Sequence, residues 1–258
     1  MRRYIFDGKN RRVPGKKSYI DIDAWMEYII VKRMVFATVR SKAMTMEEPY
    51  QSFANSYDRY IGPITRGIRK AALEMIQPVA GMRILEVGCG TGLNLQQLQR
   101  AGNGVHGIDL SLPMVIEAHR KLDRTAVLSV SDAAQLPYPD RVFDLVIAML
   151  TLHEMNDTMR SGVIKEIIRV CRTSGRLLLV DFHPGPRRFI RGWLVRGIVL
   201  FFEYSAGAEH FDNHNRFLAA GGLTGLIRSY PVAVERQKII GGGNVALFVL
   251  KINAEPVE

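Results

Sequence analysis

The sequence predicts an α/β protein built on a doubly wound parallel sheet, and three observations lead to this prediction. A short apolar run, Ile84–Val87, has the composition of a strand buried on both faces of a sheet. Three glycines at alternate positions follow it, namely Gly88, Gly90 and Gly92. Leucines at helical spacing come next, over residues 91–100. Strand, glycine turn and helix in this order form the ligand-binding unit of doubly wound sheets.

Length and composition fit one sizeable domain with additions. The chain has 258 residues, of which 47% are hydrophobic. Its two cysteines, Cys89 and Cys171, provide neither a disulfide framework nor a metal site, so we expect a reducing compartment and a cytoplasmic location. No apolar core segment follows Arg2 and Arg3, as it would in a secretion signal. No stretch reaches the roughly 18 apolar residues of a membrane-spanning helix.

The chain is strongly basic, with a net charge of +10 and a pI of about 9.8. This balance fits nucleic acid, an anionic membrane or an acidic substrate. Eleven Lys and Arg against six Asp and Glu lie in residues 1–48, which therefore hold half of the excess. Residues 1–17 form a basic arm whose aromatic residues, Tyr4 and Phe6, are too few for a nucleic-acid stacking platform, so nucleic acid is the least favoured of these partners.

Residues 18–39 have the apolar spacing of a helix that contains Trp25. Two interpretations remain open. The helix could lie among lipid headgroups, with the basic arm drawn to anionic lipid. It could instead pack on the main domain as a substrate lid, which we favour slightly because Asp21, Asp23 and Glu27 weaken attraction to acidic lipid. We divide the chain into an arm with its helix (1–48) and a main domain (49–258).

The glycine spacing disfavours a dinucleotide loop. Gly-x-Gly-x-x-Gly requires a third glycine where this chain has Leu93, counting from Gly88, or Leu95, counting from Gly90. The residues that are present, Glu86-Val-Gly-Cys-Gly-Thr-Gly92, resemble the class I S-adenosylmethionine-dependent methyltransferases. The likeness is strongest to the branch of quinone-biosynthesis and phospholipid N-methyltransferases.

This resemblance extends from about Tyr50 to Ile252. It implies a Rossmann-like sheet of seven strands in the order 3-2-1-4-5-7-6, with the last strand antiparallel. It also implies S-adenosyl-L-methionine as cofactor and S-adenosyl-L-homocysteine as product, with the cofactor at the carboxyl ends of the first and second strands. A helical lid insertion is expected at about 184–211.

The family pattern also assigns cofactor contacts. Tyr57 lies in an aromatic segment, 50–60, that closes over the methionine end of the cofactor, and the first helix is expected at 63–78. Asp109 ends the second strand, 104–108, and is positioned to accept hydrogen bonds from the ribose hydroxyls. The expected cofactor-binding residues are Tyr57, Glu86, Gly88, Cys89, Gly90, Gly92, Asp109, Leu110, Met114, Asp132, Ala133, Ala148 and Met149.

Within this set, Leu110 and Met114 are expected to flank the adenine. Asp132 and Ala133 follow the third strand, 126–130, and match the positions that hydrogen-bond the adenine ring in the family. Ala148 and Met149 end the fourth strand, 143–148, which faces the transferred methyl group.

A phenol or ammonium acceptor requires a group that takes its proton. His153 is the first candidate, and His183 and His210 are the second. The quinone C-methyltransferases carry an Arg-Asn pair near the position of His153 and Glu154, and this chain departs from them there. No motif indicates a metal site.

The remaining elements complete the sheet. We expect a helix at 161–171, a fifth strand at 175–180, a helix at 212–220, and two strands, 233–239 and 245–252, joined by a glycine turn. Between them, residues 186–202 form a basic-apolar segment that contains Trp193, suited to line an apolar pocket or to contact a membrane surface.

The sequence thus predicts methyl transfer to a lipophilic acceptor, either a phospholipid amine or a prenylated ring. The alternatives are a soluble small-molecule acceptor and a non-catalytic adaptor that binds S-adenosylmethionine. An anionic membrane is an expected partner of residues 1–42 and 186–202, which would place the protein peripherally on the inner face of the membrane. The sequence carries no signal for an oligomeric state.

Overall fold

The computed structural model describes residues 48–185 and 189–253. The basic arm and the helix expected over 18–39 therefore lie outside the described residues, as do Arg187 and Arg188. The chain divides into two compact units, Met1–Pro49 and Tyr50–Glu258, and nearly all described residues belong to the second. None of the helices in this described part is long and apolar enough to cross a membrane.

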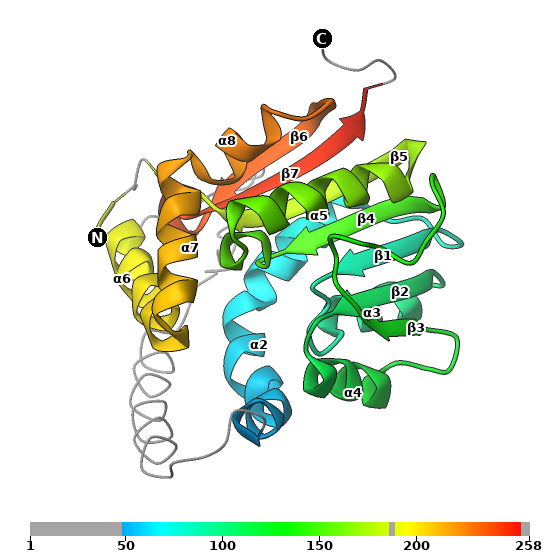
Figure 1. Cartoon of the computed structure of the whole chain (residues 1–258), viewed down its shortest axis with the longest axis horizontal. Coiled ribbons are helices and arrows are strands. Elements are labelled where there is room, and N and C mark those ends of the chain that lie inside the picture. Colours follow the sequence, from blue (N-terminus) through cyan, green and yellow to red (C-terminus); the bar gives the residue numbers. More distant parts are fainter. Residues whose placement is uncertain (1–47, 186–188, 254–258) are drawn as a thin grey trace, which may run out of the picture. The chain divides into compact units, whose positions relative to one another are not determined.

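One sheet forms the centre of the second unit. Its strands are β1 (Arg83–Val87), β2 (Gly104–Asp109), β3 (Val127–Val130), β4 (Phe143–Met149), β5 (Cys171–Phe182), β6 (Val232–Ile240) and β7 (Val245–Ile252). Over the described residues these seven strands have the order β3-β2-β1-β4-β5-β7-β6 (Figure 1). Neighbouring strands from β3 through β2, β1 and β4 to β5 pair in parallel, and β7 is antiparallel to both β5 and β6. The predicted fold and strand order are confirmed.

Burial follows from the strand sequences. The apolar run of β1 is buried from Ile84 onward, and β4 and β7 are buried over most of their length. The edge strand β6 is largely exposed, as its charged and polar residues predict. The register pairs Val87 with both Ile108 and Ala148. The carboxyl ends of β1, β2 and β4 therefore meet at one edge of the sheet.

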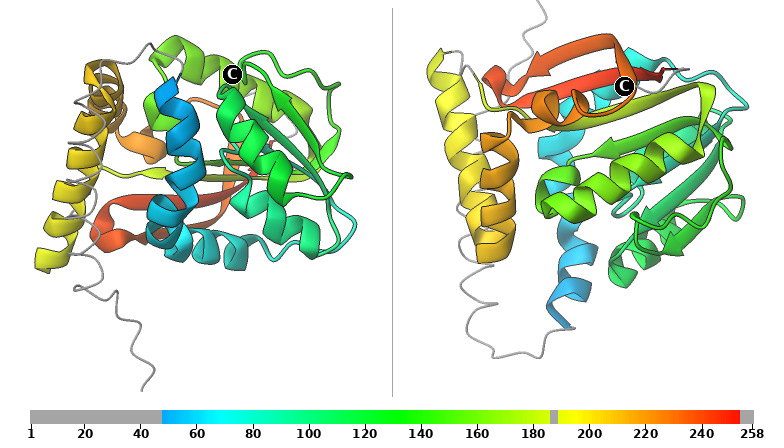
Figure 2. Two further views of the ribbon diagram at one scale, coloured as in Figure 1. Left: turned by 90° about the horizontal axis from the view of Figure 1, so that it is seen from below. Right: turned by 45° about the horizontal axis from the view of Figure 1, so that its top comes forward.

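Helices cover both faces of the sheet. They are α2 (Glu48–Ile76), α3 (Leu93–Arg100), α4 (Leu112–Lys121), α5 (Asp157–Val170), α6 (Phe189–Ala206), α7 (Ala208–Ala219) and α8 (Gly222–Ile227), with short 3₁₀ turns η1 (Leu152–Glu154) and η2 (Gly241–Gly243). Figures 1 and 2 show α5 on one face and α2 on the other. The helices α6 and α7 pack side by side as a hairpin next to the end of β4.

The first helix differs from the prediction. We expected it to begin at Pro63, but α2 runs from Glu48 through Pro63 without interruption. Proline removes only one N–H donor, the one that would bond the carbonyl four residues earlier, and the helix continues on both sides of it. Side chains also bond two backbone carbonyls just before Pro63. The Thr65 hydroxyl donates to the carbonyl of Ile61 (2.9 Å) and Arg69 Nη2 donates to that of Gly62 (2.8 Å).

Two further helices differ from the prediction. Helix α5 starts four residues before the predicted 161, because Asn156 caps it by accepting a hydrogen bond from the Met159 N–H at 2.9 Å. The short helix α8 was not predicted. It follows Gly221, whose φ of 94° ends α7 and redirects the chain.

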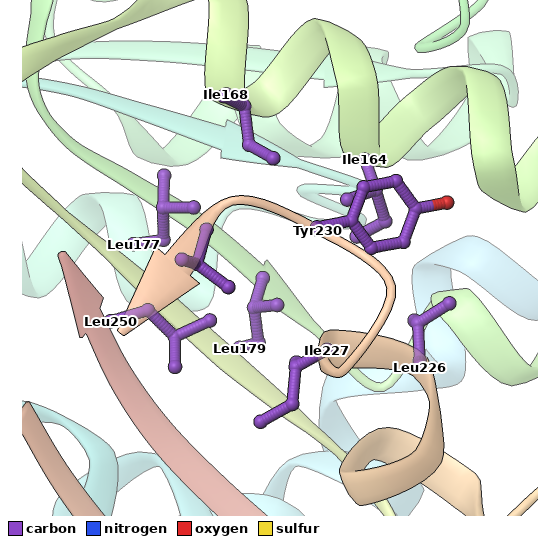
Figure 3. Close-up of a pocket in the computed structure, with 9 residues that line it drawn as sticks. Ile164, Ile168, Leu177, Leu179, Leu226, Ile227, Tyr230 and Leu250 are labelled. Carbon is purple, nitrogen blue, oxygen red and sulfur yellow. The ribbon is translucent and has the colours of Figure 1, made fainter. Parts of the chain in front are cut away.

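An apolar crevice lies between α5, α8 and the sheet (Figure 3). Its lining consists of aliphatic side chains and one tyrosine ring: Ile164, Ile168, Leu177, Leu179, Leu226, Ile227, Tyr230, Val232 and Leu250. Because only the Tyr230 hydroxyl could orient a ligand there, we assign the crevice to packing of α8 on β5.

Candidate functional site

The turn between β1 and α3 depends on its three glycines. Gly88, Gly90 and Gly92 have φ values of 67°, 52° and 75°, in the left-handed region that favours glycine. A Cβ atom added to Gly88 would lie 2.5 Å from Oγ1 of Thr151, whereas one added to Gly90 would meet no atom within 4 Å. The turn is therefore packed against protein at Gly88 and open at Gly90, where a ligand can approach the backbone.

Asp109, at the end of β2, holds this turn in place. Its Oδ2 accepts a hydrogen bond from the Gly90 N–H (2.8 Å) and its Oδ1 accepts one from the Ser111 N–H (2.9 Å). Burial raises the pKa of the Asp109 carboxyl, and the N–H donors counteract that shift. A carboxylate oxygen has two lone pairs, so both oxygens can also accept hydrogen bonds from a ribose.

Glu86 lies under the turn with one side-chain oxygen unsatisfied. Its Oε1 accepts a hydrogen bond from Asn94, while Oε2 is buried and has no hydrogen-bond partner among the described residues. Burial raises the pKa of Glu86 to about 8. A cationic group is the partner that such a carboxylate lacks. The methionine end of S-adenosylmethionine carries an ammonium and a sulfonium, so the residues present fit the cofactor expected from the sequence.

The residues expected around the adenine are arranged as follows. Leu110 is 59% exposed, and Met114 is buried. Asp132 is exposed, and its Oδ1 accepts a hydrogen bond from the Ala134 N–H at 2.8 Å, while Ala133 is buried. Leu110 and Asp132 are thus accessible to a ligand.

The other expected contact residues, Cys89, Ala148 and Met149, are less exposed than Leu110 and Asp132. Cys89 is buried, and burial raises its thiol pKa well above the ordinary value, so it is not a nucleophile. Ala148 is fully buried at the end of β4. Met149 is half-buried, with its Sδ 3.9 Å from Nδ2 of Asn94, which places the thioether beside the loop helix.

The segment around Tyr57 is attached to the glycine loop. Asp58, its neighbour, accepts a hydrogen bond from the Thr91 hydroxyl and forms an ion pair with Lys121. Burial raises the pKa of Tyr57 to about 12, and the charges of Glu154 and Asp109 contribute. Tyr57 is therefore within electrostatic reach of both the cofactor loop and the turn η1.

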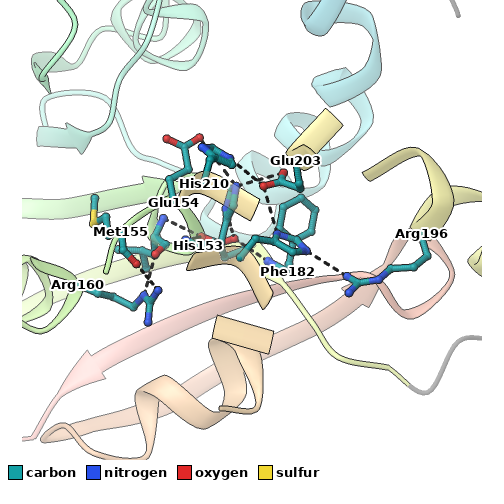
Figure 4. Close-up of polar contacts among 11 residues, drawn as sticks. His153, Glu154, Met155, Arg160, Phe182, Arg196, Glu203 and His210 are labelled. Atoms are coloured by element: carbon teal, nitrogen blue, oxygen red, sulfur yellow. Dashed lines mark hydrogen bonds and ion pairs between the residues drawn. The ribbon is translucent and has the colours of Figure 1, made fainter. Parts of the chain in front are cut away.

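A buried polar cluster occupies the ends of β4 and β5 (Figure 4). The side chains of His153 and Asp181 are 4% and 0% exposed, with His153 Nδ1 2.7 Å from Asp181 Oδ1. The other oxygen of Asp181 accepts the N–H groups of Leu152 (2.9 Å) and His153 (3.2 Å). Asp181 thus fixes both the backbone of η1 and the orientation of the imidazole.

Two further side chains hold the turn η1 rigidly. The buried Arg160 donates through Nε to the carbonyl of Leu152 (2.8 Å) and through Nη2 to that of Met155. Asn213 Nδ2 donates to the carbonyl of Glu154 at 2.9 Å. The position of His153 is therefore set by the folded backbone before any ligand binds.

The helical hairpin completes the cluster. Glu203, on α6, is 6% exposed, and its Oε1 lies 3.5 Å from His153 Nε2. On α7, His210 Nε2 and His214 Nδ1 lie 2.8 Å and 3.4 Å from Glu203 Oε2. Glu154 Oε1 lies 3.9 Å from His153 Nε2 on the more exposed side.

The charges of the cluster shift the pKa values of its side chains. Burial lowers the pKa of His153, but Asp181, Glu203 and Glu154 outweigh burial and leave it well above the ordinary value. Burial raises the pKa of Glu203, but the neighbouring His153 and His210 outweigh burial and bring it to about 2. The close contact with Glu203 raises the pKa of His210. The cluster is therefore a group of closely coupled charges.

The structure brings two of the three predicted proton acceptors together. The ring centroids of His153 and His210 lie 5.7 Å apart. His183 lies outside the cluster, because its Nδ1 accepts a hydrogen bond from the Gly185 N–H at 3.1 Å.

His210 and His214 were expected to border the pocket, whereas sequence reasoning missed Asp181 and Glu203. The four-residue spacing of His210 and His214 on one helix face, and an acid within the apolar segment that holds Glu203, were signals of this cluster.

Comparisons with known proteins agree with this geometry. Residues 85–179 match the model of a family described as a methyltransferase domain. The chain is 34% identical over 148 residues to phosphatidylethanolamine N-methyltransferase of Cereibacter sphaeroides, which covers 54% of this chain and 71% of that protein. It is 34% identical over 126 residues to demethylmenaquinone methyltransferase of Tropheryma whipplei, covering 47% and 50%.

The chain therefore spans about half the length of the demethylmenaquinone methyltransferase. Among solved structures, the PH0226 protein of Pyrococcus horikoshii superposes with a TM-score of 0.56 at 19% identity, over 75% of this chain and 92% of that one. This likeness shows the fold of the sheet and its helices.

Proposed function

Because the chain belongs to the class I S-adenosylmethionine-dependent methyltransferases, we propose that it methylates a lipophilic acceptor, either a phospholipid amine or a prenylated ring. S-adenosylmethionine is the methyl donor, and S-adenosylhomocysteine is the product. One observation carries the proposal: the register of β1 and β4, which pairs Val87 with Ala148, brings the glycine loop beside the His153 cluster.

The cofactor supplies a methyl group that its sulfonium already activates, so the protein has mainly to position the reactants. Asp109 and the backbone at Gly90 hold the sugar, and the unsatisfied Oε2 of Glu86 faces the cationic end. Tyr57, which the Asp58 contacts attach to the loop, covers the methionine end and excludes water.

The acceptor's proton leaves through the polar cluster. A phenol or a protonated amine becomes nucleophilic only when it loses that proton. His153 is oriented by Asp181, and Glu154 lies beside it on the more exposed side, within electrostatic reach of Tyr57. We infer that proton removal depends on His153 and takes place where these side chains face the cofactor.

Features of α6 support a lipophilic acceptor. Trp193 and Tyr204 on this helix are 61% and 72% exposed, which is unusual for large aromatic side chains. The same helix places Glu203 in the cluster, so acceptor-facing polar groups and exposed aromatics share one element. Two matched relatives are named for phosphatidylethanolamine and demethylmenaquinone as substrates, both lipid-like. Of these, the phospholipid amine agrees better with the departure at His153 and Glu154.

The acceptor can be identified with methyl-labelled S-adenosylmethionine and two extracts, one of membrane lipids and one of soluble metabolites. We expect label in a lipid-extractable product, identified by mass spectrometry, and loss of this label in His153→Ala with unchanged affinity for S-adenosylhomocysteine. Label only in a soluble product would overturn the lipophilic acceptor. Cofactor binding without label in either extract would support the alternative function, a non-catalytic adaptor that binds S-adenosylmethionine.

Attachment to an anionic membrane, through residues 1–42 and 186–202, is a separate part of the proposal. Sedimentation with vesicles that contain phosphatidylserine or phosphatidylglycerol tests it. We expect the full chain to sediment with these vesicles and not with neutral ones, and a chain lacking residues 1–42 to bind more weakly. Equal binding after truncation would remove the role of the arm.

A further inference from the structure

Three side chains from three separate elements converge in the cluster of Figure 4. They are His153 on η1, Glu203 on α6 and His210 on α7, and one nitrogen or oxygen atom from each lies within 4.8 Å of the others. His153 Nε2 lies 3.5 Å from Glu203 Oε1, and His210 Nε2 lies 2.8 Å from Glu203 Oε2. Two imidazoles and one carboxylate are a donor set of catalytic zinc sites, whose ligand atoms lie about 3.3 Å apart around a tetrahedral ion.

The surroundings orient His153 as a metal ligand. Its Nδ1 lies 2.7 Å from the carboxylate of Asp181, which has no proton to donate, so Nδ1 carries the hydrogen of this bond. In the neutral ring the lone pair is then on Nε2, which faces Glu203. In zinc sites, the ring nitrogen of a ligating histidine that does not bind the metal commonly donates a hydrogen bond to a carboxylate.

Glu203 has an unsatisfied oxygen at the same point. Its Oε2 is buried and has no hydrogen bond of acceptable geometry among the described residues, although His210 Nε2 is close enough for an ion pair. The side chain is 8% exposed. A buried carboxylate oxygen that lacks a directed donor is costly, and a cation placed between Glu203 and the two imidazoles would satisfy it.

His214 lies beside Glu203 but outside this set. Arg196 Nη1 lies 3.3 Å from His214 Nε2 and can only donate, so His214 Nε2 accepts and Nδ1 carries the proton. Nδ1 lies 3.4 Å from Glu203 Oε2. His214 therefore has no lone pair to offer an ion.

We propose that His153 Nε2, His210 Nε2 and the Glu203 carboxylate bind a divalent first-row transition-metal ion, with Zn²⁺ as the best match to the donors. The His210 side chain is 23% exposed, which gives the ion a route from solvent and leaves a coordination position on that side. Three protein ligands with one open position are typical of catalytic rather than structural zinc.

The consequence for catalysis rests on the proposed function. An acceptor hydroxyl or a water at the open position would lose its proton more easily, because a bound divalent ion lowers the pKa of oxygen ligands. His153 would then act by holding the ion, and the neighbouring Glu154 would receive the proton. The binding of the ion itself does not depend on methyl transfer.

The test uses the full chain without a histidine tag, freed of metal with a chelator. Zn²⁺ alone is titrated by calorimetry, and Co²⁺ by visible absorption, where tetrahedral coordination produces intense bands. We expect one ion per chain. Glu203→Gln and His210→Ala should each weaken Zn²⁺ binding at least roughly 100-fold, and Asp181→Asn by roughly 10- to 100-fold. His119→Ala, on the exposed face of α4, should leave it unchanged.

No saturable Zn²⁺ binding, or binding that survives both Glu203→Gln and His210→Ala, overturns the proposal. Glu203→Gln keeps the shape of the side chain, and His210 is partly exposed, so at least one of these variants should fold. Folding is checked by binding of S-adenosylhomocysteine at the glycine loop. Because Zn²⁺ is titrated without cofactor or acceptor, a failure of metal binding is distinguished from a failure of methyl transfer.

Discussion

Nδ1 of His153 lies 2.7 Å from Oδ1 of Asp181. This buried contact links the turn η1, which follows β4, to the end of β5. Asp181 also accepts two backbone N–H groups from the turn that carries His153. The strand ends therefore determine where the imidazole points. The orientation of His153 thus depends on Asp181, just as the turn after β1 depends on its glycines.

Asp181→Asn tests the positioning role of this carboxylate. The amide keeps the size of the side chain but removes its charge and one acceptor, so the imidazole loses its fixed orientation. We expect turnover to fall by roughly 10- to 100-fold, with unchanged affinity for S-adenosylhomocysteine. Steady-state kinetics and calorimetry measure the two. Asp140→Asn, at an exposed carboxylate that pairs with Arg169, is the matched control. Normal turnover in Asp181→Asn would show that His153 needs no such partner.

Gly88→Ala tests the packing of the cofactor turn. Its φ of 67° is strained for alanine, and the new Cβ would lie 2.5 Å from Thr151 Oγ1. We expect a loss of about 2 to 4 kcal/mol in the free energy of unfolding, together with weaker cofactor binding. Gly67→Ala on α2 meets no atom within 4 Å and should stabilise the helix by up to about 1 kcal/mol. Urea unfolding compares the two. Equal effects of the two substitutions would contradict this account of the turn.

Glu86 predicts a pH dependence of stability. Burial raises its pKa to about 8 in the folded protein, whereas a solvent-exposed glutamate in the unfolded chain has its ordinary pKa of 4.5. The folded state therefore holds this proton more tightly, and the free energy of unfolding falls as pH rises from about 4.5 through 8. The full effect is roughly 4 to 5 kcal/mol.

Glu86→Gln removes this titration. Urea unfolding of wild type and variant at pH 5.5 and pH 8.5 measures it, because the difference between the two proteins isolates Glu86 from other groups. We expect the wild type to lose more stability than the variant over this range. The same pH slope in both proteins would show that Glu86 is ionised at neutral pH in the folded state.

Trp193→Ala tests whether α6 contacts the acceptor. Removal of an exposed aromatic side chain should raise KM for a lipid acceptor by roughly 10-fold and leave cofactor affinity unchanged, because about 1.4 kcal/mol of apolar contact corresponds to that factor. Val234→Ala removes an exposed apolar group from β6 and should change neither constant. An unchanged KM in Trp193→Ala would separate α6 from the acceptor site.

The cofactor half of the fold could be predicted closely from the sequence, because its signals are local. An apolar run, three glycines and an acid at the next strand end fix β1, the turn and Asp109 within a short stretch. The order of the strands was implied by the resemblance to the methyltransferase family and not by these local signals. Pro63 misled the prediction of α2, because a proline costs a helix one hydrogen bond and this helix continues through it.

The His153 cluster could be predicted only in part, because its members are distant in sequence. His153, Asp181, Glu203 and His210 come from η1, β5, α6 and α7, and only the folded chain brings them together. The sequence could not show which of His183 and His210 belongs to the cluster, because both are histidines near predicted pocket segments. Their contacts distinguish them: His183 bonds a loop N–H, whereas His210 lies within ion-pair distance of Glu203.

The most direct test of the central claim is calorimetric titration of the folded wild-type chain with S-adenosylmethionine and S-adenosylhomocysteine, repeated with Asp109→Ala. We expect one site per chain for both ligands, and affinity about 10- to 100-fold lower in the variant, because one or two charge-assisted hydrogen bonds to the ribose are lost. No heat with either ligand, or equal affinity in Asp109→Ala, would contradict it.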